Sequence, residues 1–176
     1  MNASTNKVAQ KLRMSSSGFT LIELMVTIAV LAIIVGLAAP SISTQLANQR
    51  VKSTTATLAN ALKEAKVESI IRRQDVTLSY NSSSTPKVIM MTIPDLTTNP
   101  SSVSTIASYT ISDKSTVTQT ITPSTVTEIV FQPNKKIADN ATVVYTICDS
   151  GSDSETPKQV SLTGIANVNI INAGSC

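Results

Sequence analysis

The sequence predicts an α+β fold: a long N-terminal α-helix, membrane-spanning in its first half, packed on a small antiparallel β-sheet head. Residues 19–39 form an apolar run with a single charge, Glu23, and helical spacing of apolar residues continues to about Arg73. After Asp75 the pattern changes to an alternation of period two, rich in Thr and other β-branched residues. These two patterns divide the chain into a helical half and a β half.

The composition excludes several classes of protein. The 176 residues include no His, no Trp and two Cys. A catalytic His, a His/Cys zinc cluster and a haem-type His ligand are therefore excluded. The many Ser and Thr hydroxyls have no His to activate them, and the acidic residues are scattered without evident pairing. We therefore expect a protein that is not an enzyme, with no cofactor and no metal.

The first 18 residues differ from the rest of the chain in charge. They carry Lys7, Lys11 and Arg13 and no acid. Removing them leaves 14 − 3 = 11 bases against 11 acids, so the remainder is neutral. Residues 1–18 therefore form a basic leader before the apolar run.

Residues 19–40 are predicted to be a transmembrane helix. The 21 residues of the run at 19–39 are enough, because a helix rising about 1.5 Å per residue needs roughly 20 apolar residues to cross a bilayer core of about 30 Å. Basic residues precede the run, which places the N-terminus in the cytoplasm and everything after Pro40 outside it.

Residues 41–73 continue the helix in amphipathic form. Small and apolar residues recur at spacings of three and four, which predicts one packed face: Val51, Thr55, Leu58, Leu62, Ala65 and Ser69. The whole helix would run for about 50 residues, interrupted only by Gly36 and Pro40, a length unusual for a globular domain.

Residues 74–176 are predicted to form the β-rich head. Turn residues separate eight candidate strands. The strands are Val76–Tyr80, Val88–Ile93, Ser104–Ile111, Thr116–Ile121, Thr127–Gln132, Thr142–Cys148, Gln159–Leu162 and Val168–Ile171.

The most informative stretch joins the leader to the apolar run. Gly18 directly precedes the run, and Glu23 lies inside it, four residues after Phe19. An ionisable group in lipid costs about 2.5–3.5 kcal/mol on insertion scales, so it is rarely retained without a partner. Cleavage after Gly18 would give Phe19 a new α-amine one helical turn from Glu23. That amine, on the same or a neighbouring subunit, is a natural counter-charge.

The segment GFTLIELMVTIAVLAIIVGLAAP, residues 18–40, resembles the N-terminus of type IV pilins and type II secretion pseudopilins. The resemblance implies that residues 1–18 are a class III leader peptide, that a prepilin peptidase cuts after Gly18 on the cytoplasmic side, and that Phe19 becomes the N-methylated terminus. Glu23 would be the assembly glutamate, and Pro40, with Gly36, would bend the helix.

The resemblance also implies partners and a location. The partners would be the prepilin peptidase, other major and minor pilins or pseudopilins, and the inner-membrane assembly platform. The protein would be a single-pass inner-membrane protein, with its N-terminus cytoplasmic and its head periplasmic, before it enters a pilus or pseudopilus.

A second resemblance indicates a branch within the pilins and pseudopilins. Residues 61–65 and 68–78, with the segment Ile129–Asn134 and a late Cys pair, are similar to the GspH/FimT branch and to FimU-type minor pilins. This implies a helix packed on a small two-sheet head. It also implies a minor pilin involved in pilus assembly or initiation, at or near the tip. A GspH-like minor pseudopilin of a type II secretion system is the alternative.

The two cysteines, Cys148 and Cys176, would both lie outside the cytoplasm. An even pair in an oxidising compartment predicts a disulfide, which would stabilise the head by about 3–4 kcal/mol in the chain-entropy model. Two free buried thiols are the alternative.

Three segments have alternative interpretations. Gly36-Leu37-Ala38-Ala39 offers small residues for an ordinary secretory signal, but Glu23 and Pro40 argue against it. Arg72-Arg73 could form a ligand-binding patch. The simpler interpretation is that these cations in the last turn stabilise the negative C-terminal end of the helix. Lys135-Lys136 is most simply a solvated turn.

Some FimT-type proteins are thought to hold DNA through a basic C-terminal tail. Residues 172–176 carry no base, and residues 74–176 hold five bases against eight acids. A role as a DNA-uptake receptor and binding to nucleic acid are therefore not expected.

The mature protein should begin at Phe19 and be N-methylated, because Gly18 abuts an apolar run that contains Glu23. Mass analysis of the N-terminal peptide from membrane-extracted protein tests this prediction. A start at Ala39 or Pro40 would instead establish an ordinary secretory signal.

Overall fold

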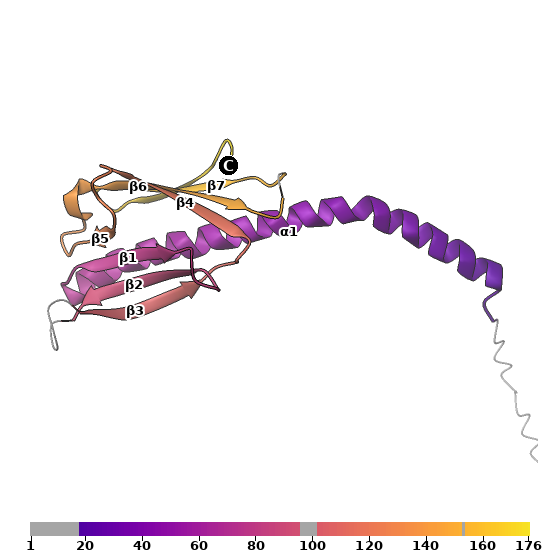
Figure 1. The fold of residues 1–176 in the computed structure, drawn as a ribbon, viewed down its shortest axis with the longest axis horizontal. Coiled ribbons are helices and arrows are strands. Elements are labelled where there is room, and N and C mark those ends of the chain that lie inside the picture. The colour runs from indigo at the N-terminus through magenta and orange to yellow at the C-terminus, as the bar shows by residue number, and fades with distance from the viewer. Residues whose placement is uncertain (1–17, 96–101, 153) are drawn as a thin grey trace, which may run out of the picture. The chain divides into compact units, whose positions relative to one another are not determined.

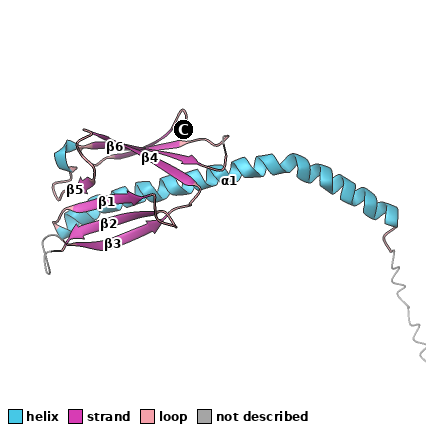
Figure 2. Cartoon of the chain, in the orientation of Figure 1, coloured by secondary structure: helices cyan, strands magenta, loops and turns pink. Residues whose placement is uncertain are grey.

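The computed structural model describes residues 18–95, 102–152 and 154–176. The predicted leader, apart from Gly18, lies outside the described residues. The chain divides into two compact units, residues 1–39 and 40–176, and each is described by itself. One long helix, α1, is followed by eight strands and a short 3-10 helix, η1 (Figures 1 and 2).

Helix α1 extends over Leu21–Arg72, as the sequence predicts. Arg73 adopts φ 55°, a left-handed conformation that ends the helix one residue after its last turn. Arg72 pairs with Glu68 one turn earlier. Arg72 and Arg73 therefore both contribute to the C-terminal end of the helix, Arg72 through its ion pair and Arg73 through its backbone conformation.

The second part of α1, from Ser41 onward, buries one face. Its buried residues recur at spacings of three and four, and all six residues predicted for the packed face are among them. The buried positions are Ala47, Val51, Thr54, Thr55, Leu58, Ala59, Ala61, Leu62, Ala65 and Ser69. Several are Ala, Ser or Thr, and such small side chains let the strands approach the helix closely.

The eight strands form two four-stranded antiparallel sheets. The first has the order β3-β2-β1-β5, and the second has the order β4-β6-β7-β8. The bounds are β1 Val76–Asn81, β2 Val88–Pro94, β3 Val103–Thr110, β4 Ser115–Thr122, β5 Ile129–Phe131, β6 Thr142–Asp149, β7 Lys158–Leu162 and β8 Val168–Asn172; η1 is Ala138–Asn140. All eight predicted strands are present, with ends within two residues of those predicted.

The core of residues 40–176 lies between the two sheets and around the buried face of α1 (Figure 1). Strand β6 shows the alternation clearly: Val143, Tyr145, Ile147 and Asp149 are buried, and the residues between them are partly exposed. Phe131 from the first sheet, Tyr145 from the second and Leu62 from α1 belong to one cluster. The sheets therefore depend on the helix for much of their burial.

Polar side chains of α1 also bind the head at successive positions along the helix. Thr54 shares a buried hydroxyl–hydroxyl hydrogen bond of 2.8 Å with Ser115 of β4. Lys66 donates to the carbonyl oxygen of Ala166 at 2.9 Å. The Tyr109 hydroxyl of β3 donates a hydrogen bond to the Glu64 carboxylate. The pKa of Tyr109 is raised to about 12, mainly by burial and in second place by this carboxylate. These bonds fix the axial register of the helix against both sheets.

The strongest of these links joins Arg50 to Asp149 at the end of β6. Arg50 Nε lies 2.6 Å from Asp149 Oδ2, and Arg50 Nη2 lies 3.0 Å from Oδ1. The Asp149 side chain is 0% exposed and that of Arg50 is 27% exposed. The Gly151 N–H adds a bond of 2.9 Å. The pair joins residues 99 positions apart in the chain, so no local sequence pattern indicates it.

Leu62→Ala should destabilise the head by about 2–5 kcal/mol, because it removes a fully buried side chain at the junction of helix and sheets. Chemical denaturation of the detergent-solubilised protein measures this. Val67→Ala, on the exposed side of the same helix, is the matched control and should cost far less. Equal effects of the two substitutions would contradict the assignment of the buried face.

Asp149→Asn should lower stability at neutral pH, and the difference from the wild type should vanish in acid. The hydrogen bonds from Arg50 hold the pKa of Asp149 below its ordinary value. A depressed carboxyl pKa stabilises the fold above the unfolded-state pKa, near pH 4, and this contribution is lost as pH falls through the folded-state pKa. Thermal melts from pH 7 downward test it. Asp139→Asn, at an exposed position, should show no such trend.

Candidate functional site

The start of α1 places the predicted processing and assembly residues within six positions of one another. Phe19 is 72% exposed and directly precedes Thr20. At Gly18, an added Cβ would meet no atom of the described residues within 4 Å.

Thr20 caps the N-terminus of the helix by accepting the backbone N–H of Glu23. The Thr20 carbonyl oxygen accepts the Leu24 N–H, and its hydroxyl oxygen accepts the Glu23 N–H at 3.2 Å. The spacing Thr-x-x-Glu is that of a capping box, in which the glutamate position also favours the helix start. Sequence reasoning treated Glu23 only as a charge, although the same four residues contained this signal. The cap bond uses the backbone N–H of Glu23, so the Glu23 carboxylate favours the helix start only through its place in the first turn, where the helix dipole stabilises a negative charge.

The carboxylate of Glu23 lies on an exposed helix surface. The two ion pairs among the described residues are Arg50–Asp149 and Arg72–Glu68, so neither involves Glu23. A counter-charge for Glu23 within the membrane would have to come from a group such as a free amine at Phe19.

The side chains from Leu21 to Leu37 are exposed although most are apolar. The large ones include Leu21, Ile22, Leu24, Met25, Val26, Ile28, Val30, Leu31, Ile33, Ile34, Val35 and Leu37. An uncovered apolar surface of this extent marks a site of contact with a membrane or with other proteins. This segment therefore needs a partner that the chain itself does not supply.

Among the described residues, no single straight helix is long and apolar enough to be identified as a membrane span. The bent pair Leu21–Leu37 and Ser41–Arg72 meets the criteria of length and composition together. The side chains of residues 38–40 lie outside the description, so the kink at Pro40 stays a prediction. At Gly36 an added Cβ would meet no atom within 4 Å in the described part of the chain.

The predicted disulfide between Cys148 and Cys176 is present, with the two Cα atoms 6.1 Å apart. It ties the end of the chain to β6, next to Asp149. Glu155 lies nearby, and its Oε1 accepts the Asp149 N–H at 3.0 Å. Within the described part of the chain, no group of three or more carboxylate or thiol side chains is arranged to hold a metal ion.

Lys135 and Lys136 are both exposed, in the turn between β5 and η1. The turn closes with the Gln132 N–H donating to the Lys136 carbonyl oxygen at 2.9 Å. These lysines therefore form a solvated turn, as expected.

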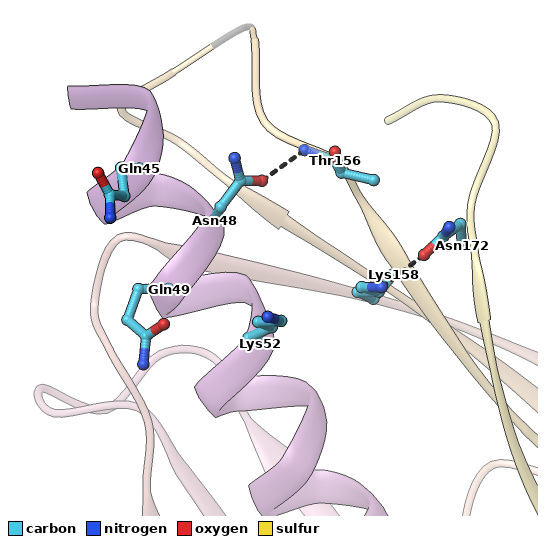
Figure 3. A pocket seen from close by; sticks show the side chains of 7 residues that line it. All are labelled: Gln45, Asn48, Gln49, Lys52, Thr156, Lys158 and Asn172. Atoms are coloured by element: carbon cyan, nitrogen blue, oxygen red, sulfur yellow. Dashed lines mark hydrogen bonds between the residues drawn. The ribbon is translucent and has the colours of Figure 1, made fainter. Parts of the chain in front are cut away.

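A polar groove lies where α1 enters the head (Figure 3). Four side chains of α1 and three of the segment from Thr156 to β8 line it: Gln45, Asn48, Gln49, Lys52, Thr156, Lys158 and Asn172. Sequence reasoning did not find this groove, because its two sides are more than a hundred residues apart in the chain.

Comparison with protein families gives two matches. Residues 13–39 match the prokaryotic N-terminal methylation motif, and residues 54–164 match the family of the type II transport protein GspH. The second match covers 111 of the 176 residues, more than half of the chain. The comparison with curated proteins gives no match.

Two solved structures share the fold. The type IV minor pilin FimU of Pseudomonas aeruginosa has a TM-score of 0.56 at 14% identity, covering 73% of this chain and 96% of FimU. The minor pseudopilin EpsH of the Vibrio cholerae type 2 secretion system has a TM-score of 0.56 at 8% identity, covering 72% of this chain and 99% of EpsH. The two family matches lead to one conclusion, with which the shared fold agrees: the chain belongs to the family of the type II transport protein GspH and carries the prokaryotic N-terminal methylation motif.

Proposed function

We propose that the protein is a minor pilin that acts in the assembly or initiation of a type IV pilus, at or near its tip. The observation that carries the proposal is the exposed apolar segment 21–37, which precedes a folded head. Thr20 caps the start of this helix, and its first turn contains the carboxylate of Glu23. Such a chain works by assembling with other subunits. The family is one of structural subunits, so no enzymatic role is proposed.

The choice of a pilus over a secretion system rests on the late Cys pair of the sequence, Cys148 and Cys176, which resembles that of FimU-type minor pilins and forms a disulfide in this chain. A minor pseudopilin of a type II secretion system is the second candidate, and the equal TM-scores of FimU and EpsH keep it open. Identifying the subunits that co-purify with membrane-extracted fibres separates the two.

The proposed life cycle follows from the order of the segments. Residues 1–18 are a leader that a prepilin peptidase removes, and the new terminus, Phe19, is methylated. Residues 19–40 hold the chain in the inner membrane, residues 41–73 pack on the head, and residues 74–176 form the periplasmic head. An assembly platform in the inner membrane then moves the subunit into the fibre beside other pilins.

The proposed mechanism of assembly is a charge pair in the membrane. Glu23 and the amine of Phe19 on an adjacent subunit are each costly alone in lipid, and a matched pair relieves both costs. Lipid offers no hydrophobic drive for helices to associate, so the apolar surfaces of two helices do not define a register. The pair would set the axial position of one helix against its neighbour.

Glu23→Gln should leave processing and membrane insertion intact and lower the amount of subunit in fibres by at least about tenfold, because the charge pair is lost. Gln preserves the capping box, so this variant isolates the charge. Glu23→Ala should behave alike. The measurement is the ratio of subunit in sheared fibres to subunit in membranes.

Thr20→Ala is the matched control for the helix cap. It removes the hydroxyl that accepts the Glu23 N–H and leaves the charge in place. The charge model expects near-normal incorporation of this variant. An unchanged ratio for Glu23→Gln would overturn the charge-pair model. A loss confined to Glu23→Ala and Thr20→Ala would show instead that the helix cap matters.

A further inference from the structure

The second sheet ends in an edge strand, β8, whose backbone is paired on one side only. The Ala173 N–H, just after β8, donates to the Pro157 carbonyl oxygen at 2.9 Å. Hydrogen-bonded pairs alternate along an antiparallel ladder, so this bond fixes which residues of β8 face β7. The residues whose N–H and C=O groups point away from β7 are Val168, Ile170 and Asn172.

Strand β8 is also exposed and uncharged. Four of its five residues are exposed. Ile170 and Ile171, which face opposite sides of the sheet, are 45% and 47% exposed. Residues 168–172 contain no charged residue and no proline, and their register with β7 has no bulge. Proteins commonly use such features to blunt an edge, because an open edge pairs with other chains.

The other three edge strands of the described sheets are each blunted. A β-bulge interrupts the pairing of β3 with β2. Strand β5 is three residues long, and Ile137 bridges its outer side. On β4, Lys87 Nζ donates to the Ser115 carbonyl oxygen at 2.8 Å, and the backbone of Val117 is hydrogen-bonded to the Tyr80 hydroxyl. The open edge of β8 is therefore an exception within this head.

The outward groups of β8 define the kind of partner that fits. They repeat about every 7 Å along the strand, with one donor and one acceptor at each outward residue. An extended backbone segment offers acceptors and donors at the same spacing, and its alternate side chains can contact Ile170 and Ile171. The partner is therefore a strand of a protein.

Lysines at both ends of β8 decide between a second copy and a different protein. Lys66 Nζ donates to the Ala166 carbonyl oxygen at 2.9 Å, just before β8 begins. At the other end, Asn172 lines the polar groove with Lys52 and Lys158 (Figure 3). Pairing of β8 with β8 of a second copy, in either direction, would bring lysines of the two copies together at both ends, and like charges oppose such pairing.

We propose that β8 receives an extended segment of a different subunit of the same fibre, which adds a fifth strand to the second sheet. The segment would place apolar side chains against Ile170 and Ile171 and a carboxylate beside the lysines at one end. This inference rests on the proposed function as a pilin subunit. The two heads would be joined by backbone hydrogen bonds.

Amide hydrogen exchange of the full chain distinguishes a paired edge from an open one. Exchange is followed in the detergent-solubilised chain alone and in extracted fibres, with fragmentation that resolves single amides. The outward amides of Ile170 and Asn172 should exchange at least about tenfold more slowly in fibres. The amides of Asn169 and Ile171 already bond β7 and should change little. Equal rates for the outward amides in the two preparations would overturn the proposal.

Proline at an outward position closes the edge. Ile170→Pro removes an N–H that β7 does not use, so the ladder between β7 and β8 keeps its bonds. This variant should lower the ratio of subunit in sheared fibres to subunit in membranes by about tenfold. Ile170→Val keeps the N–H and should enter fibres normally.

Ser108→Pro is the matched control. The Ile111 N–H donates to the Lys87 carbonyl oxygen, and the alternation from this pair makes Ser108 an outward position on the bulged edge of β3. This variant should enter fibres normally. Equal losses for Ile170→Pro and Ser108→Pro would overturn the proposal. Thermal melts of the solubilised variants check that each head is folded, and the exchange experiment on the wild type does not depend on either variant.

Two further outcomes would overturn the assignment in different ways. Slow exchange of the outward amides in concentrated solutions of the chain alone would show that a second copy occupies β8. Absence of the wild-type chain from fibres would refute the proposed function and this inference with it. A wild-type chain that is present in fibres, with fast outward amides, would refute this inference alone.

Discussion

The burial of one face of α1, from Ala47 to Ser69, is the constraint on which the head depends. Each sheet has only four strands and needs an apolar surface to cover its inner face. The helix supplies that surface to both sheets at once, so the two sheets and the helix form a single core. Polar links from Asn48 to Ser69 then fix where each strand lies along the helix. The positions of the groove and of the disulfide follow from this register.

The elements of the fold could be predicted from the sequence because their signals are local. The period of α1 and the alternation of strands such as β6 are visible within short windows, and all eight strands lie within two residues of their expected ends. The Arg50–Asp149 pair could not be predicted, because it depends on the distant end of β6 meeting α1 at Arg50. The polar groove escaped prediction for the same reason. The cap at Thr20 was available in the sequence and was overlooked.

One helix therefore serves two environments with two kinds of surface. Residues 21–37 expose apolar side chains and keep one carboxylate among them, whereas from residue 41 onward most exposed side chains are polar and the buried face combines small side chains with Leu58 and Leu62. In the proposed charge pair, Glu23 is the feature of the exposed part that specifies a neighbour, so the information for assembly would be concentrated in very few atoms. The head carries the remaining specificity through its surface.

The links between α1 and the head have a mechanical consequence. They are spread along more than five turns of helix, from Asn48 to Ser69, and they reach β3, β4, the residue after β5, the end of β6 and the loops on both sides of β7. A pull along the helix axis loads these contacts side by side, as shear, and does not peel them apart one after another. The load at which a head separates from its helix then follows the combined strength of the contacts. This geometry suits a subunit whose helix lies in a fibre under tension.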